Sequence, residues 1–202
     1  MKMPEHETHI TRALDPEAAL LAGCRAGERD ALEMLIKKYQ PAVLRVCTSL
    51  LGTSEVEDLV QDIFIKVLKK IRDFEGRSAL FTWIYEIAVN RCRDELRRRK
   101  RRRWFSLHDM PQETVEQIPL DEASASEQLE TSEMRQQLRQ ALSKLEPKYR
   151  ELVILRDLEG LSYEEVARIS GIKMELVKSR LYQARQILST KMKRYFEEAS
   201  HV

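Results

Sequence analysis

The feature that most constrains the fold is a pair of amphipathic segments that meet at a glycine, in residues 161–188, LSYEEVARISGIKMELVKSRLYQARQIL. Ser162 and Glu165 have the S-x-x-E spacing of a capping box, which predicts a helix start, and Gly171 suits a helix end. The second segment repeats apolar residues at helical spacing: Val177, Leu181, Ala184 and Leu188. Its other face is basic, so the pattern predicts a DNA-binding helix-turn-helix, with an ordinary helical hairpin as the alternative.

The preceding sequence predicts further helices, because 6 Gly and 6 Pro in 202 residues argue against a turn-rich β fold. We expect helices from residue 16 to about 103, with Pro41 interrupting or kinking one of them. Ser54 and Glu57 predict a capping box at the start of the next helix. Its buried stripe would be Val60, Phe64, Val67, Leu68 and Ile71. A helix is also expected to run from about residue 147 to Gly160.

Charge divides the chain into blocks, although the net charge is only +2. Residues 66–103 hold 14 Lys and Arg against 5 Asp and Glu, whereas residues 104–133 hold 0 against 8. The basic block ends in the run RRRKRRR and is typical of a surface that binds phosphates. The acidic block contains two prolines and lacks apolar periodicity, which predicts a flexible linker. The chain is therefore expected to be all-α, with two small helical domains, 1–103 and 133–202, joined by a linker, 104–132.

Several classes of function find no support in the sequence. Three widely spaced cysteines, Cys24, Cys47 and Cys92, form neither a disulfide framework nor a zinc motif, and burial as small apolar residues is favoured. The four histidines lie near the termini and in the acidic block, and no nucleotide-binding or hydrolase motif is present. We expect no enzyme activity, cofactor or metal. No membrane-spanning run or signal-peptide core is visible, which predicts a cytoplasmic protein.

With these motifs in view, the sequence resembles the extracytoplasmic-function (ECF) group of bacterial sigma factors over nearly its whole length. DLVQDIFIKVLKKI is similar to the helix of sigma region 2 that binds core RNA polymerase, and DFEGRSALFTWIYEIAVNRCRDELRRRKR to the segment that melts and reads the minus-ten promoter element. Residues 142–185 are similar to region 4, which reads the minus-thirty-five element. The linker is too short for the middle domain of housekeeping sigma factors.

The resemblance implies three sets of site residues. Polymerase binding is expected from Asp58, Gln61, Asp62 and Ile65, and minus-ten DNA binding from Phe74, Arg77, Ser78, Phe81, Trp83, Asn90 and Arg91. The loop over residues 74–78 is expected to receive a flipped non-template base. Minus-thirty-five DNA binding is expected from Lys178, Ser179, Arg180, Tyr182, Gln183 and Arg185. Gln183 stands where the family commonly has arginine, and the proline and glycine-threonine that often precede the recognition helix are absent.

The implied function is promoter-specific initiation of transcription, in a stress or envelope response. Its partners would be core RNA polymerase, promoter DNA and an anti-sigma factor, without membrane insertion of the chain itself. The alternative is a stand-alone helix-turn-helix regulator, which would need a dimer interface or ligand pocket before residue 132. A nuclear RNA-binding protein that uses the arginine run is a further alternative, but no RRM or KH signature accompanies it.

Overall fold

The structure, a computed structural model, describes residues 16–105, 134 and 136–199 and is helical throughout these residues apart from turns and short connections. The N-terminal helices are α1 (Pro16–Ala26), α2 (Arg29–Leu51), α3 (Glu57–Lys70) and α4 (Leu80–Phe105), with the short 3-10 helix η1 (Ile71–Asp73) between the last two. A helix over residues 136–143 follows. The chain then forms α6 (Pro147–Val153), η2 (Ile154–Leu158), α7 (Tyr163–Ser170) and α8 (Met174–Ala199).

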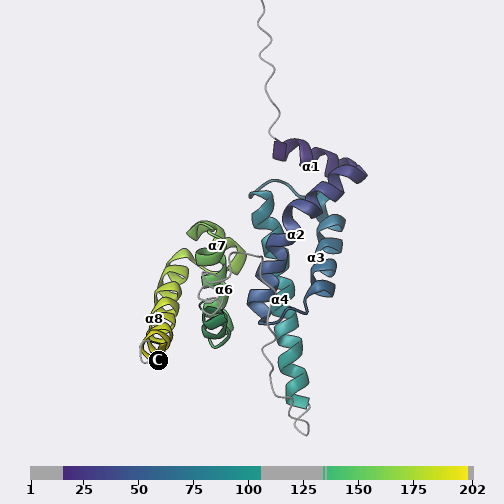
Figure 1. Cartoon of the computed structure of the whole chain (residues 1–202). Coiled ribbons are helices and arrows are strands. Elements are labelled where there is room, and N and C mark those ends of the chain that lie inside the picture. The colour runs from purple at the N-terminus through teal and green to yellow at the C-terminus, as the bar shows by residue number, and fades with distance from the viewer. Residues whose placement is uncertain (1–15, 106–133, 135, 200–202) are drawn as a thin grey trace, which may run out of the picture.

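The all-α, two-part architecture predicted from the sequence is confirmed. Helices α2, α3 and α4 pack against one another, with α1 across one end, while α6, α7 and α8 form a second group beside them (Figure 1). The C-terminal half of α4 projects beyond its group (Figure 1), as its arginine-rich sequence requires, because it offers few apolar side chains to bury. The predicted linker lies outside the described residues, except that α4 continues to Phe105, two residues past the expected domain end.

The helix-turn-helix has the predicted local geometry. The hydroxyl of Ser162 accepts a hydrogen bond from the backbone N–H of Glu165, and the Glu165 carboxylate accepts one from the backbone N–H of Ser162. Gly171 ends α7 with φ 68°, a left-handed conformation that costs glycine little. Val177, Leu181 and Ala184 of the predicted stripe are buried, and Leu188 is partly buried.

The capping box predicted at Ser54 was wrong, and two other helices differ in detail from the expected pattern. Helix α3 begins after Val56 rather than Ser54 and has no side-chain cap; instead, the backbone N–H of Val56 donates to the Ser54 carbonyl. Helix α2 runs through Pro41 without interruption. The helix from residue 147 becomes a π-helical turn over Ile154–Leu158, which ends just before Gly160 at φ 73°. These differences arise from backbone bonding that side-chain spacing does not specify.

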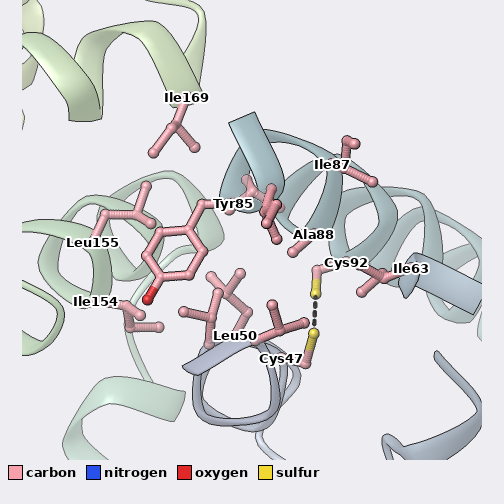
Figure 2. Packing of buried hydrophobic residues seen from close by; sticks show 14 of the residues in the cluster. Cys47, Leu50, Ile63, Tyr85, Ile87, Ala88, Cys92, Ile154, Leu155 and Ile169 are labelled. Atoms are coloured by element: carbon pink, nitrogen blue, oxygen red, sulfur yellow. Dashed lines mark hydrogen bonds between the residues drawn. The ribbon is translucent and has the colours of Figure 1, made fainter. Parts of the chain in front are cut away.

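The two groups of helices share one hydrophobic cluster. Tyr85 of α4 and Leu50 of α2 lie beside Ile154, Leu155 and Ile169 of the second group (Figure 2). All five are buried, with exposures of 6% or less. The domains are therefore docked in this structure, an outcome that the sequence did not indicate.

The capping box yields the first testable prediction. Ser162→Ala removes the acceptor for the Glu165 N–H and should lower the free energy of unfolding by about 1 kcal/mol, measured by urea denaturation. Ser179→Ala is the matched control, since Ser179 is exposed on α8 and caps no helix. Equal stability of the two variants would contradict the role of the cap.

Candidate functional site

The polymerase-binding residues expected from the resemblance lie together on the outer face of α3. Asp58, Gln61, Asp62 and Ile65 are all exposed, and Ile65 retains 50% of its accessible surface despite being apolar. The opposite face of α3 is buried and includes Leu59, Val60, Ile63, Phe64 and Val67. Asp62 accepts a hydrogen bond of 2.7 Å from Nη2 of Arg91 on α4. The helix thus presents a mixed acidic and apolar surface that is connected at one point to the predicted minus-ten residues.

The predicted minus-ten residues divide between surface and core. Arg77 and Asn90 are exposed, while Ser78, Phe81, Trp83 and Arg91 are partly exposed. Phe74 is only 6% exposed, and its ring packs against Trp83 with 5.0 Å between centroids. A buried ring is not available to stack on a base in this structure, so the expectation of a direct DNA contact by Phe74 needs correction: its side chain anchors the loop.

The predicted minus-thirty-five residues line one side of α8. Lys178, Ser179, Tyr182, Gln183 and Arg185 are exposed, and Tyr182 retains 66% of its accessible surface. Two of them have partners within the domain. Gln183 Oε1 accepts a bond of 2.9 Å from the Tyr149 hydroxyl, and Arg185 donates to Asp157, which raises the pKa of the Arg185 guanidinium. Arg180 is only partly exposed and lines the space between the domains.

Sequence reasoning missed the residues that join the two domains. Glu151 of α6 is 8% exposed and accepts two hydrogen bonds from Arg93 of α4, at 2.8 and 2.6 Å. Ser170 donates to the same carboxylate at 2.7 Å, and its carbonyl accepts from Arg93 at 3.1 Å. The only signal in the sequence was the acidic Glu151 beside an apolar run, LVIL.

A second polar contact lies at Glu159. Its carboxylate accepts from Arg45 at 3.0 Å and from the Tyr85 hydroxyl at 2.8 Å. Burial, followed by the bond to Glu159, raises the pKa of Tyr85 well above its ordinary value. Thr82 also donates to Glu165 at 3.4 Å. Carboxylates of the second domain therefore meet α2 and α4 at three positions.

Arg150 also connects the two domains, through hydrogen bonds to backbone carbonyls. It donates to the backbone carbonyls of Leu142, Ser143 and Leu145 within its own domain, and to that of Leu50 at 2.9 Å in the other. Burial lowers the pKa of its guanidinium. A cavity of about 230 Å³ opens beside it, lined among others by Cys92, Arg93, Glu151 and Arg180.

The cysteines are buried, as predicted. Cys24, Cys47 and Cys92 are free thiols with exposures of 1% or less. Cys47 and Cys92 lie with their sulfur atoms 3.5 Å apart in the core of the first domain (Figure 2). Their mutual hydrogen bond, together with burial, raises the pKa of Cys92 and keeps it a thiol.

Within the described ranges, no group of three or more His, Cys, Asp and Glu residues is placed to hold a metal ion. No helix among the residues described is long and apolar enough to cross a membrane.

Comparison with known proteins decides what these surfaces belong to. The family model for Sigma-70 region 2 matches residues 35–102, and that for Sigma-70 region 4 matches residues 135–188. The ECF RNA polymerase sigma-E factor of Haemophilus influenzae is 30% identical over 181 residues, covering 87% of this chain and 95% of that protein. The sigma-E factor of Escherichia coli K12 is 32% identical over 186 residues, covering 87% and 94%.

The chain belongs to the ECF group of RNA polymerase sigma factors. Its fold agrees: the sigma factor RpoE from Bartonella quintana, solved with the anti-sigma factor NepR, superposes with a TM-score of 0.68 at 30% identity, covering 80% of this chain and 96% of that one. CnrH, solved with the cytosolic domain of CnrY, has the same fold, with a TM-score of 0.65 at 24% identity over 89% and 99% of the two chains. The function of this sigma factor is promoter-specific initiation of transcription by RNA polymerase, and sigma factors in general are not enzymes.

The contact between the domains gives a second prediction. Glu151→Ala leaves Arg93 and Ser170 without their acceptor and should lower the free energy of unfolding by about 1–3 kcal/mol in urea denaturation. Glu164→Ala removes the same charge from an exposed site on α7 and is the control. If both variants have the stability of the parent protein, Glu151 does not join the domains in solution.

Proposed function

We propose that this sigma factor uses three separate faces: α3 for core polymerase, the loop after η1 with α4 for the minus-ten element, and α8 for the minus-thirty-five element. The observation that carries the proposal is that α3 and α8 lie on opposite sides of the molecule (Figure 1), in different groups of helices. Each has an exposed polar face backed by buried apolar residues. Because the two faces belong to different domains, one chain can hold the polymerase and promoter DNA at once, whether or not the domains stay docked. The polymerase performs the chemistry, and the chain supplies recognition, in the cytoplasm.

The domain assignment follows the same division. We assign residues 1–103 to region 2, residues 104–132 to the linker and residues 133–202 to region 4. The family matches at 35–102 and 135–188 fall within these two domains and support the assignment.

For polymerase binding, the α3 surface offers Asp58, Gln61 and Asp62 around the apolar Ile65. A partner helix could bury Ile65 while its basic residues meet the carboxylates, which is the usual arrangement of an apolar centre and a polar rim. The ion pair between Asp62 and Arg91 must break if both residues bind their separate partners.

For the minus-ten element, the exposed Arg77 and the partly exposed Ser78 at the loop would contact a flipped base. Phe81 and Trp83 retain enough exposed surface to take part in stacking, which contributes about 1–3 kcal/mol per base. Asn90 and Arg91 would follow the strand along α4. The arginines at the end of α4 add attraction for phosphates, so binding should weaken as salt rises.

For the minus-thirty-five element, α8 would enter the major groove as the second helix of the helix-turn-helix. Lys178, Ser179 and Tyr182 face outward, with Arg180 at the edge of the face. The bonds of Gln183 to Tyr149 and of Arg185 to Asp157 hold these two side chains in place before DNA arrives. Groups fixed in advance lose less conformational entropy on binding.

An anti-sigma partner forms the second part of the proposal. The RpoE structure from Bartonella quintana contains an anti-sigma factor, and its fold matches across 80% of this chain, which spans both domains. We expect a corresponding protein to bind this chain and to block access to the polymerase, as part of a stress or envelope response. The measurement is whether that protein displaces the chain from core polymerase on a sizing column.

The polymerase assignment predicts that Asp62→Arg weakens binding to core RNA polymerase about tenfold, because a repulsive charge replaces an attractive one at the contact. Co-elution and fluorescence titration with bacterial core polymerase would measure the loss. Arg91→Ala also breaks the Asp62–Arg91 pair but should leave core affinity unchanged. Unaltered affinity of the Asp62→Arg variant would show that this face does not bind polymerase.

The minus-thirty-five assignment predicts the reverse pattern for α8. Lys178→Ala and Tyr182→Ala should each reduce transcription from a cognate promoter about fivefold or more, since each removes a contact to DNA, and neither should change core affinity. Run-off transcription with the reconstituted holoenzyme is the readout. Ser189→Ala, on an exposed site further along α8, is the control. Full activity of both test variants would place the promoter contact elsewhere.

A further inference from the structure

The loop that joins η1 to α4 is held at both ends. At its start, the backbone N–H of Phe74 donates to the Ile71 carbonyl at 3.3 Å, and the Phe74 ring is buried against Trp83. At its end, the Ala79 carbonyl accepts the N–H of Trp83 at 3.2 Å, in the first turn of α4. Between these points Gly76 is exposed and takes φ 74°, a conformation that other residues rarely adopt. The path of the loop tip therefore depends on how its two ends are fixed.

Helix α1 makes a third contact that restrains the loop. The guanidinium of Arg25, in the last turn of α1, donates from Nη2 to the backbone carbonyl of Phe74 through a partly buried hydrogen bond. Helix α1 packs against η1, which leads directly into the loop. The turn after α1 also approaches closely: Gly27 has φ 80°, and a Cβ at this position would lie 3.0 Å from Nη2 of Arg72. The C-terminal end of α1 therefore packs closely against the residues that lead into the loop.

The bond from Arg25 fixes the orientation of one peptide group. The Phe74 carbonyl belongs to the peptide that leads into Glu75, so a charged donor on that oxygen restrains the rotation of this peptide plane. Phe74 has ψ 111°, an extended value that directs the chain away from η1. Residues Arg77 and Ser78 follow within four positions, and their placement depends on that direction. Groups that select a base must be held to within about half an ångström.

We propose that Arg25 is a positioning residue for minus-ten recognition, which holds the loop over residues 74–79 in the shape that accepts a base. Helix α1 precedes the segment matched by the Sigma-70 region 2 model, which begins at residue 35. The promoter-reading unit of this chain then includes α1 as well as η1, the loop and α4. This inference rests on the proposed function of the loop.

The test compares two substitutions of Arg25, which alter the hydrogen bond to the Phe74 carbonyl, with a substitution of Arg29, which removes a positive charge and leaves that bond intact. Arg25→Ala removes the hydrogen-bond donor. Arg25→Lys keeps a positively charged donor on a shorter side chain. Arg29→Ala is the matched control: it lies four residues away, is exposed, and pairs with Glu33 within α2 rather than with the loop. Thermal unfolding of each variant checks that the domain is folded.

The readout is base discrimination by the holoenzyme. Wild-type chain with bacterial core polymerase first selects its preferred sequence from fork-shaped DNA whose non-template strand is randomised at the minus-ten positions. The ratio of affinities for the selected DNA and for single-base substitutions is then measured for each variant. Arg25→Ala should reduce this ratio about tenfold at one or more positions, with core affinity unchanged. Arg25→Lys should restore part of it, and Arg29→Ala should match the wild type.

The outcomes separate the two proposals. If wild-type holoenzyme selects no sequence at these positions, the assignment of the loop fails, and the role of Arg25 fails with it. If the wild type discriminates and folded Arg25→Ala discriminates equally well, only the role of Arg25 is overturned. A lower melting temperature with an unchanged ratio would likewise mean that Arg25 is a structural tether alone.

Discussion

The structure depends on the two-sided burial of the first half of α4. Ala88 and Cys92 lie toward Cys47 and Ile63 of the first domain, while Tyr85 reaches the second beside Ile154 and Leu155 (Figure 2). A helix that is apolar on more than one face must be covered on more than one face. The arginine-rich second half has few apolar side chains to cover and extends beyond the bundle. There Glu95 pairs with Arg98 and Arg99, which lower the pKa of its carboxyl group.

The contact between the domains combines this apolar cluster with carboxylates of the second domain. Glu151 and Glu159 hold Arg93, Arg45 and Tyr85, all from the helices of the first domain. Polar interfaces of this kind within a chain are typical of domains that can also move apart. Under the proposed assignment they must do so, because two promoter elements about 25 base pairs apart are separated by about 85 Å of DNA at 3.4 Å per base pair. The docked arrangement therefore differs from the promoter-bound one.

Repeating patterns made most of the fold predictable. Most of the two predicted stripes is buried, because a helical period of 3.6 residues fixes which residues share a side. The exceptions, Leu68 and Leu188, are partly buried. The α7 cap and Gly171 were also correct, since those signals act over only a few residues. The failed prediction at Ser54 shows the limit: the same spacing occurs there, but the backbone N–H of Val56 is satisfied by the Ser54 carbonyl and by Glu57.

The sequence by itself determined the family, the helical class and the outward faces of α3 and α8. Each of these follows from the spacing of apolar and polar residues within a helix, or from the order of motifs along the chain. Only the tertiary structure decided that Phe74 is an anchor rather than an exposed ring, that Arg25 reaches its carbonyl, and that Glu151 meets Arg93 across 58 positions. The physical reason is that burial and long-range hydrogen bonds depend on how helices pack. A single sequence indicates which face of a helix is apolar, but it does not identify the residues of other helices that pack against that face.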